Sequence, residues 1–348
     1  MIGISVYAGM DNSIEEIVEY LNKARSFGVQ TLFTSAHIPE TDENFLEDLK
    51  ILLEESSKLG FTTIIDISKN YFEKLDMGRY KIDYLRLDYG FTLEEAAKMT
   101  NEYDFGITVN ATTFTSEDIE NFIKFGGNVE KINACHNFYP RKGTGISEEL
   151  FIERNKIFQR YGIKTMAFIP SRDGRRGPVY EGLPTLEKHR DVLPMVSAQH
   201  LFKLGVDFVV IGDAIASDEE LESLTTLEKG VNVIPIKLND NLSKVELELL
   251  NSIHTNRMDP GEYAIRSQES RLIKNGEIVP KNNRLPRNKY SVTIDNKEYK
   301  RYEGEFQILK KELPADERVN VVGDSGAGSI LIDLLEPGEK FKFYIMED

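Results

Sequence analysis

The feature that most constrains the fold of this chain is a series of short apolar segments, most of which end in or beside a polar side chain. The segments lie near residues 2–7, 31–35, 61–67, 83–88, 105–110, 129–135, 164–169 and 207–212. Each has the length of a strand that is buried on both faces, and amphipathic segments separate most of them. Eight such units predict a (β/α)8 TIM barrel. A doubly wound open sheet is the alternative, but it usually has fewer strands, and the first turn lacks a GxGxxG phosphate fingerprint.

Helix boundaries in this part of the chain are marked by local signals. Ser13 with Glu16, and Thr92 with Glu95, have the spacing of capping boxes at helix starts. Gly28 follows an amphipathic segment and suits the left-handed conformation that ends many helices. These signals support alternating strands and helices over residues 1–230.

The alternation ends after Gly230. Residues 231–348 contain further apolar runs separated by Gly, Pro, Asn and Asp, and only residues 242–251 have a helical pattern. This composition predicts a smaller β-rich domain, a compact barrel or a sandwich. With 348 residues, the chain is also long for a single core. We therefore expect one domain at 1–230 and a second at 231–348.

Charge and composition exclude several classes of function. The net charge is −15, which is unfavourable for binding nucleic acid but allows a small anionic ligand where basic residues cluster. The single cysteine, Cys135, permits no intramolecular disulfide and no cysteine-based zinc site, and no HExxH-like metal motif occurs. No segment has the length of a membrane span, and the N-terminus has no signal-peptide pattern. We expect a cytoplasmic protein that needs no metal or cofactor; the oligomeric state stays open.

Three carboxylates follow the predicted strands and are candidates for catalysis. Asp66, Asp88 and Asp213 each lie at a strand end, where a parallel barrel gathers its active-site residues. Two carboxylates in different environments can divide acid and base roles, as glycoside hydrolysis requires. The structural alternative is that each Asp caps the following turn. Glu40 and His37, just after the second strand, are weaker candidates.

The loop after the sixth strand carries a second set of polar residues, from His136 to Gly145. Its directed hydrogen-bonding groups could position a sugar, and its Gly-x-Gly turn could hold an anion through backbone amides. The alternative is a solvated surface loop. The candidate sugar contacts are Asn110 and Asn133 at strand ends, His136, Asn137 and Tyr139 in the loop, and Glu187 further along the chain.

Basic residues cluster in two loops of this acidic chain. Arg172, Arg175 and Arg176 lie within five residues after the seventh strand, and Arg141 lies in the loop after the sixth. Arginine binds phosphate or carboxylate through paired hydrogen bonds, and this region of a barrel is a frequent phosphate site. A solvated basic loop is an equally good interpretation of the pattern alone.

Four separated motifs give the chain a family resemblance: MIGISVYAGM, DYLRLDYG, HNFYPRKGTG and GRRGPVYEGLPTLEKHR. Together they resemble the bacterial 6-phospho-N-acetylmuramidases, glycoside hydrolase family 170. The resemblance implies a (β/α)8 barrel followed by a cyclophilin-like β-barrel domain. It also implies hydrolysis of the β-1,4 bond of 6-phospho-N-acetylmuramyl-N-acetylglucosamine in cell-wall recycling. It does not identify the catalytic pair.

The residues and the resemblance together lead to a specific hypothesis. Asp88 is the expected general acid, and Asp66 or Asp213 is its partner. The arginines bind the two anionic groups of the sugar. One alternative is another phosphosugar enzyme (an aldolase, an isomerase or a lactyl-ether-cleaving enzyme), with Lys69 as a Schiff-base candidate. The other is a phosphosugar sensor without catalysis.

Overall fold

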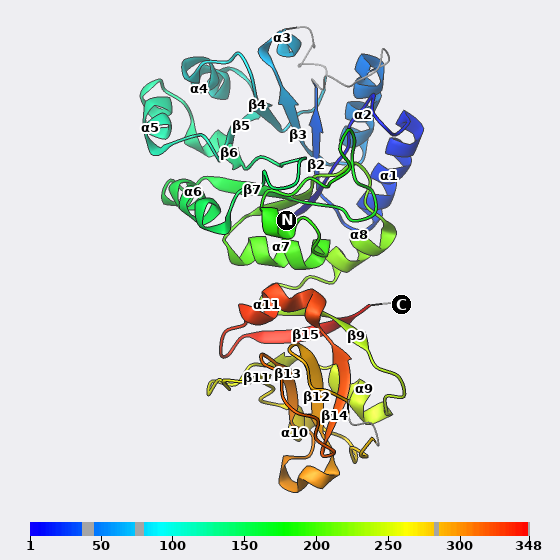
Figure 1. The fold of residues 1–348 in the computed structure, drawn as a ribbon. Helices are drawn as coiled ribbons and strands as arrows, with labels where there is room; N and C mark the ends of the chain where they lie inside the picture. Colours follow the sequence, from blue (N-terminus) through cyan, green and yellow to red (C-terminus); the bar gives the residue numbers. More distant parts are fainter. Residues whose placement is uncertain (37–44, 74–79, 282–284, 347–348) are drawn as a thin grey trace. The chain divides into compact units, whose positions relative to one another are not determined.

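The computed structural model describes residues 1–36, 45–73, 80–281 and 285–346 (Figure 1). The chain divides into two compact units, Met1–Thr225 and Thr226–Asp348. The boundary lies a few residues before the position expected from the sequence.

The first unit is a closed barrel of eight strands in the order β1 to β8, and every neighbouring pair is parallel. The predicted (β/α)8 fold is therefore confirmed. The sixth strand begins later than expected because residues 129–131 form a 3-10 turn. The strands are β1 (Ile2–Ser5), β2 (Thr31–Ser35), β3 (Thr62–Ile67), β4 (Tyr84–Leu87), β5 (Gly106–Asn110), β6 (Ile132–Cys135), β7 (Lys164–Ile169) and β8 (Phe208–Ile211).

Helices follow the strands around the outside of the barrel (Figure 1). The predicted capping boxes are present at α1, where Ser13 and Glu16 exchange hydrogen bonds, and at α4, where Thr92 and Glu95 do the same. Gly28 has a φ of 82°, the left-handed conformation expected after α1. The helices are α1 (Ile14–Ser26), α2 (Phe45–Lys58), α3 (Lys69–Phe72), α4 (Leu93–Glu102), α5 (Ser116–Lys124), α6 (Glu148–Arg160), α7 (Pro194–Lys203) and α8 (Asp218–Thr225).

The barrel interior is filled by side chains, and the residues in it show which face of each strand points inward. Phe33, Cys135 and Phe168 belong to one buried cluster. Successive side chains of a strand point to opposite faces, so residues two apart share a face. Cys135 is fully buried in this cluster, and burial raises the pKa of its thiol to about 12, so it is a packing residue.

The second unit is a seven-stranded sheet in the order β10-β15-β9-β14-β12-β13-β11. Its pairs are antiparallel except for β9 with β15. The β-rich character expected for this part is confirmed, and the helix expected at 242–251 is α9. The elements are β9 (Val231–Leu238), α9 (Lys244–Leu250), β10 (His254–Thr255), β11 (Ala264–Arg266), α10 (Ser270–Ile273), β12 (Ser291–Asp295), β13 (Phe306–Leu309), β14 (Val319–Asp324), α11 (Ser329–Asp333) and β15 (Lys340–Ile345).

Candidate active site

The carboxylates of Asp66 and Asp88 meet at one buried arginine, Arg86. Its Nη1 atom lies 2.5 Å from Oδ1 of Asp66 and 3.7 Å from Oδ1 of Asp88. Its Nη2 atom donates a hydrogen bond of 2.5 Å to Oδ1 of Asn137. Arg86, which is on β4, therefore joins Asp66 of β3, Asp88 just after β4 and Asn137 of the loop after β6. It is not among the residues predicted above, although its spacing of two from Asp88 places both on one face of the chain.

Burial makes the environments of these two carboxylates unequal. The side chain of Asp66 is 15% exposed and that of Asp88 is 42% exposed. Burial opposes the charge of Arg86, but the neighbouring Asp66 carboxylate outweighs it and holds the pKa of Arg86 above its ordinary value. Asp66 is thus the buried partner of a permanent cation, whereas Asp88 is open to solvent. Such an inequality allows two carboxylates to take different roles.

Asp213, the third predicted carboxylate, is fully buried and anchors the loop after β7. Its oxygens accept hydrogen bonds from the backbone N–H groups of Ser171 at 2.8 Å, Arg176 at 3.0 Å and Leu183 at 3.2 Å. Burial raises the pKa of Asp213, and the three N–H donors act in the opposite direction. This geometry gives Asp213 a structural role that disfavours the predicted catalytic one, because its buried oxygens bind three backbone donors of the loop.

Arg176 is the arginine that packs over the barrel interior. Its guanidinium carbon lies 4.2 Å from the centroid of the Tyr7 ring and 5.4 Å from that of Phe138. Its Nε atom donates to the carbonyl of Gly177 at 3.2 Å. Within the described ranges no carboxylate forms an ion pair with Arg176. The aromatic rings hold the cation by cation–π contact, which leaves its charge available to an anion.

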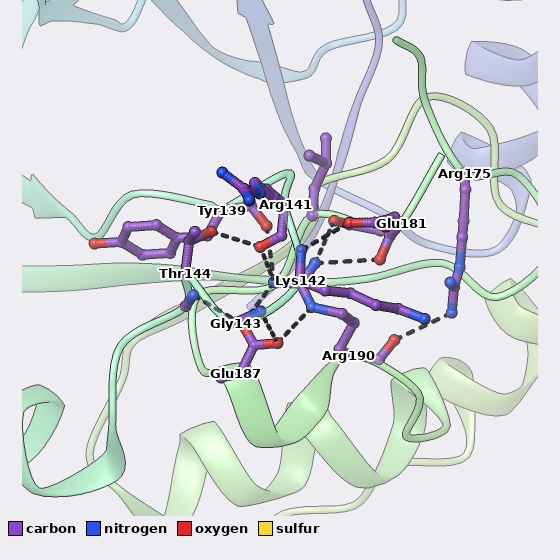
Figure 2. Close-up of polar contacts among 12 residues, drawn as sticks. Tyr139, Arg141, Lys142, Gly143, Thr144, Arg175, Glu181, Glu187 and Arg190 are labelled. Carbon is purple, nitrogen blue, oxygen red and sulfur yellow. Dashed lines mark hydrogen bonds and ion pairs between the residues drawn. The ribbon is translucent and has the colours of Figure 1, made fainter. Parts of the chain in front are cut away.

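The glycine turn after β6 already holds an anion, the carboxylate of Glu187. The N–H groups of Gly143 and Gly145 donate to its two oxygens at 2.9 and 2.8 Å (Figure 2). Arg190 adds hydrogen bonds of 2.8 Å from Nε and 2.7 Å from Nη2. The bond from Arg190, opposed by burial and assisted by the two N–H groups, lowers the pKa of Glu187 to about 2. The turn binds an anion as predicted, but the anion is the carboxylate of Glu187 itself. Glu187 therefore holds the loop in place, and its predicted contact with substrate stays a prediction.

Arg190 connects two loops through its remaining donors. Nη1 donates to the carbonyls of Glu181 and Gly182 at 3.1 and 3.0 Å. Nη2 donates to the carbonyls of Tyr139 and Arg141 at 3.0 and 3.1 Å (Figure 2). The loop after β6 is therefore fixed to the segment that follows β7. The described contacts of Tyr139 and Arg141 here are made by their backbones, which leaves their proposed roles untested.

The other predicted arginines have different surroundings. Arg175 donates from Nη2 to Oδ1 of Asp191 at 2.8 Å, so its charge is already paired. Arg172 is exposed, and its backbone N–H donates to Glu220 at 2.6 Å. Arg141 is exposed as well. Among the four arginines, Arg176 is therefore the one whose guanidinium is held against aromatic rings.

His136 packs away from the site. It is fully buried, and its ring lies against Phe151 of α6 with the centroids 4.3 Å apart. Burial lowers the pKa of His136 to about 3, so the ring stays neutral at ordinary pH. The prediction of a sugar-positioning His136 is corrected: it follows Cys135, which faces the barrel interior, and so points to the opposite side. Asn137 is two residues beyond Cys135 and reaches Arg86.

The two predicted strand-end asparagines have different positions. Asn110 ends β5 as expected, and its Oδ1 accepts the N–H of Thr112 at 3.0 Å, so one of its two polar groups caps the turn while its contact with a sugar stays a prediction. Asn133 is the second residue of β6 and pairs with Lys164 at the start of β7, so it lies low in the barrel and not at the strand end. Glu40 and His37 lie outside the described residues.

Lys69, the Schiff-base candidate, is engaged in an ion pair. Its Nζ atom lies 2.5 Å from Oε1 of Glu95, and this hydrogen bond raises the pKa of Lys69. Schiff-base chemistry needs an uncharged amine, so the contact disfavours the aldolase alternative. The described part of the chain contains no group of three or more His, Cys, Asp and Glu side chains placed to hold a metal ion. It also contains no helix with the length and apolar character needed to cross a membrane.

Two models of one known family match almost the whole chain. The family model of the N-terminal part of 6-phospho-N-acetylmuramidase matches residues 2–226, and that of the C-terminal part matches residues 232–344. The chain belongs to the 6-phospho-N-acetylmuramidase family. It is thus a glycosidase, and the predicted family and enzyme class are confirmed.

Two solved structures are similar to this 6-phospho-N-acetylmuramidase family member over almost their whole length. An uncharacterized B. cereus protein shares 31% identity with a TM-score of 0.81, and the match covers 99% of each chain. A conserved Enterococcus faecalis protein of unknown function shares 29% identity with a TM-score of 0.81, covering 99% of this chain and 96% of that one. No curated protein matches the chain.

Proposed function

We propose that the barrel unit hydrolyses the β-1,4 bond between 6-phospho-N-acetylmuramic acid and N-acetylglucosamine, in the cytoplasm, as a step of cell-wall recycling. The reaction class follows from the family. The observation that supports this site is the meeting of Asp66 and Asp88 at one nitrogen of Arg86. Both carboxylates are at the carboxyl end of the barrel, where such enzymes carry out their chemistry.

Asp88 is the proposed general acid. Its side chain is open to solvent, so it can reach the glycosidic oxygen and give it a proton as the bond to the anomeric carbon breaks. The leaving sugar departs as an alcohol, and water finally supplies the hydroxyl group at the anomeric carbon. Asp88 then recovers a proton from that water.

Asp66 is the proposed partner. Its carboxylate is held beside Arg86, and the Arg86–Asn137 hydrogen bond fixes the direction of the guanidinium. A fixed negative charge near the anomeric carbon stabilises the positive charge that develops there. Asp66 can do this directly or by orienting the acetamido group of the substrate as the nucleophile.

Arg176 is the proposed primary anion contact, since its stacked guanidinium has no carboxylate partner among the described residues. Arg141 and Arg172 are exposed in the same two loops and supply the surrounding positive charge, whereas Arg175 contributes less because it is paired with Asp191. The substrate carries a phosphate and a carboxylate, so two anion contacts are needed. For the second unit we propose a cyclophilin-like domain, which by itself implies no prolyl isomerase activity.

The Asp88→Asn variant tests the acid role. Loss of general-acid catalysis is expected to lower kcat about 10²–10⁴-fold on the phosphorylated disaccharide. The loss should be much smaller on the corresponding glycosyl fluoride, because fluoride leaves without a proton. Asp104→Asn, at an exposed carboxylate outside the site, is the matched control. Near-normal turnover of the disaccharide by a folded Asp88→Asn variant would remove Asp88 from the mechanism.

A further inference from the structure

A hollow of about 320 Å³ lies beside Asp88, between the loops that follow β4 and β5. In the ribbon view, α4 and α5 are neighbours on this side of the barrel (Figure 1). Small-molecule sites in proteins start at about this size, roughly 300 Å³. None of the roles assigned above uses the hollow, although it borders the proposed acid. Its lining includes Asp88, Phe91, Asn110, Thr113, Phe114 and Asp118.

The described charged residues that line the hollow are one arginine, whose terminal nitrogens are already bonded, and two carboxylates. Arg86 is the cation in its lining, and both of its terminal nitrogens bind Asp66 and Asn137. Asp118 accepts hydrogen bonds from the N–H and hydroxyl groups of Thr115 at the start of α5, at 2.8 and 2.7 Å. Asp88 adds a second carboxylate. An anionic sugar is therefore disfavoured here, because no unpaired cation among the described lining residues would meet its charge.

The opposite charge pattern occurs on the loops after β6 and β7. Arg176 is stacked on Tyr7, and Arg141 is exposed in the neighbouring loop that Arg190 holds in place. The barrel mouth, the carboxyl-end opening of the strands, is thus basic on the β6–β7 side and acidic on the β4–β5 side. A substrate with one doubly anionic sugar and one neutral sugar fits such an opening in a single orientation.

We infer that the hollow binds the neutral leaving sugar, an N-acetylhexosamine without phosphate or carboxylate. The inference rests on the proposed function and deepens it. A general acid stands next to the departing oxygen, so the leaving sugar must lie beside Asp88, as the hollow does. The partly exposed rings of Phe91 and Phe114 offer faces on which a sugar ring packs, and Asn110 and Thr113 offer polar groups for its hydroxyls.

The test compares a disaccharide with a substrate that has no leaving sugar. Phe114→Ala is expected to lower kcat/KM on the phosphorylated disaccharide about tenfold and to leave kcat/KM on the 6-phospho-N-acetylmuraminyl fluoride within twofold. Free N-acetylglucosamine, titrated into the whole protein by calorimetry or NMR, should bind the wild type and bind Phe114→Ala more weakly. Phe125→Ala, an exposed phenylalanine at the other end of α5, is the matched control. If Phe114→Ala does not fold, Thr113→Val replaces it in the same comparison, because this variant removes one exposed hydroxyl from the lining of the hollow.

Each outcome bears on a different claim. Equal losses on both substrates, or no loss on either, would overturn the assignment of the hollow. So would wild-type protein that does not bind N-acetylglucosamine, or binding that Phe114→Ala leaves unchanged. If the wild type cleaves neither substrate, the proposed function fails, and the sugar titration alone then decides whether the hollow binds an N-acetylhexosamine.

Discussion

Replacing Arg190 with alanine would test how the two basic loops are held in place. The Arg190 side chain is 4% exposed, and it donates to Glu187 and to carbonyls in segments 139–141 and 181–182. The substitution leaves four carbonyl oxygens without this donor and one carboxylate without its cation. The loops would lose their common attachment, even though neither loop is itself altered.

The size of the effect follows from burial. Removing one partner of a buried ion pair costs about 3–5 kcal/mol, and a hydrogen bond to a charged group contributes about 1.5–3 kcal/mol. Water reaches Glu187, whose side chain is 34% exposed, so the lower end of the first range applies. We expect the free energy of unfolding of the barrel unit to fall by roughly 3 kcal/mol. The free energy of unfolding of Arg190→Lys should lie between those of the wild type and Arg190→Ala, because one ammonium group cannot replace a planar guanidinium that binds three segments.

Urea unfolding of the whole chain, followed by circular dichroism, measures this loss. Hydrogen exchange at residues 139–145 provides a local signal, and protection there should fall in Arg190→Ala under native conditions. Arg160→Ala, at an exposed arginine in the last turn of α6, is the control. A loss below about 1 kcal/mol with unchanged exchange in the loop would refute the argument that Arg190 holds the two loops together.

Three further variants test other parts of the structure. The pKa of His136 is about 3 in the folded protein, so the unfolded chain binds a proton first as pH falls below about 6.5. The free energy of unfolding therefore declines from there towards pH 3, by up to about 1.4 kcal/mol per pH unit. His136→Phe should keep activity and show a shallower acid decline in urea titrations; loss of activity in a folded variant would restore His136 to the site. Asp213→Asn replaces one acceptor oxygen by an NH2 group in front of three N–H donors, so the free energy of unfolding should fall by about 1–3 kcal/mol. Thermal unfolding measures this loss, and an unchanged melting temperature would contradict the anchoring role of Asp213. Arg176→Gln should raise KM for the phosphorylated disaccharide at least tenfold with a smaller effect on kcat, and an unchanged KM would rule out Arg176 as the main anion contact.

The fold could be predicted from the sequence because it depends on local, repeated patterns. Apolar runs, capping boxes and helix-ending glycines each need only a few neighbouring residues, and all of them favour the same alternation of strand and helix. The carboxyl-end position of Asp66 and Asp88 followed from that topology. Their meeting at Arg86 did not, since an arginine inside an apolar run can also be solvated at a strand edge.

Other parts of the site depend on contacts between distant segments. The glycine turn at 143–145 has the chemistry of an anion site, but only the structure shows that Glu187 fills it. The surroundings of Asp213 could not be predicted from local sequence either, because its three backbone donors come from a loop that begins about forty residues earlier in the chain. His136 was within reach of the sequence: strict alternation from the inward-facing Cys135 directs its ring outward.

The stacking of Arg176 on Tyr7 and Phe138 affects how quickly a ligand could bind. A guanidinium held by a carboxylate must first release that carboxylate before it can accept another anion, and the exchange adds a barrier. Aromatic faces hold the same group without competing for its N–H donors. Among the residues that the structure describes, no carboxylate pairs with Arg176, so a phosphate or carboxylate would meet a guanidinium whose one described hydrogen bond runs from Nε to the carbonyl of Gly177.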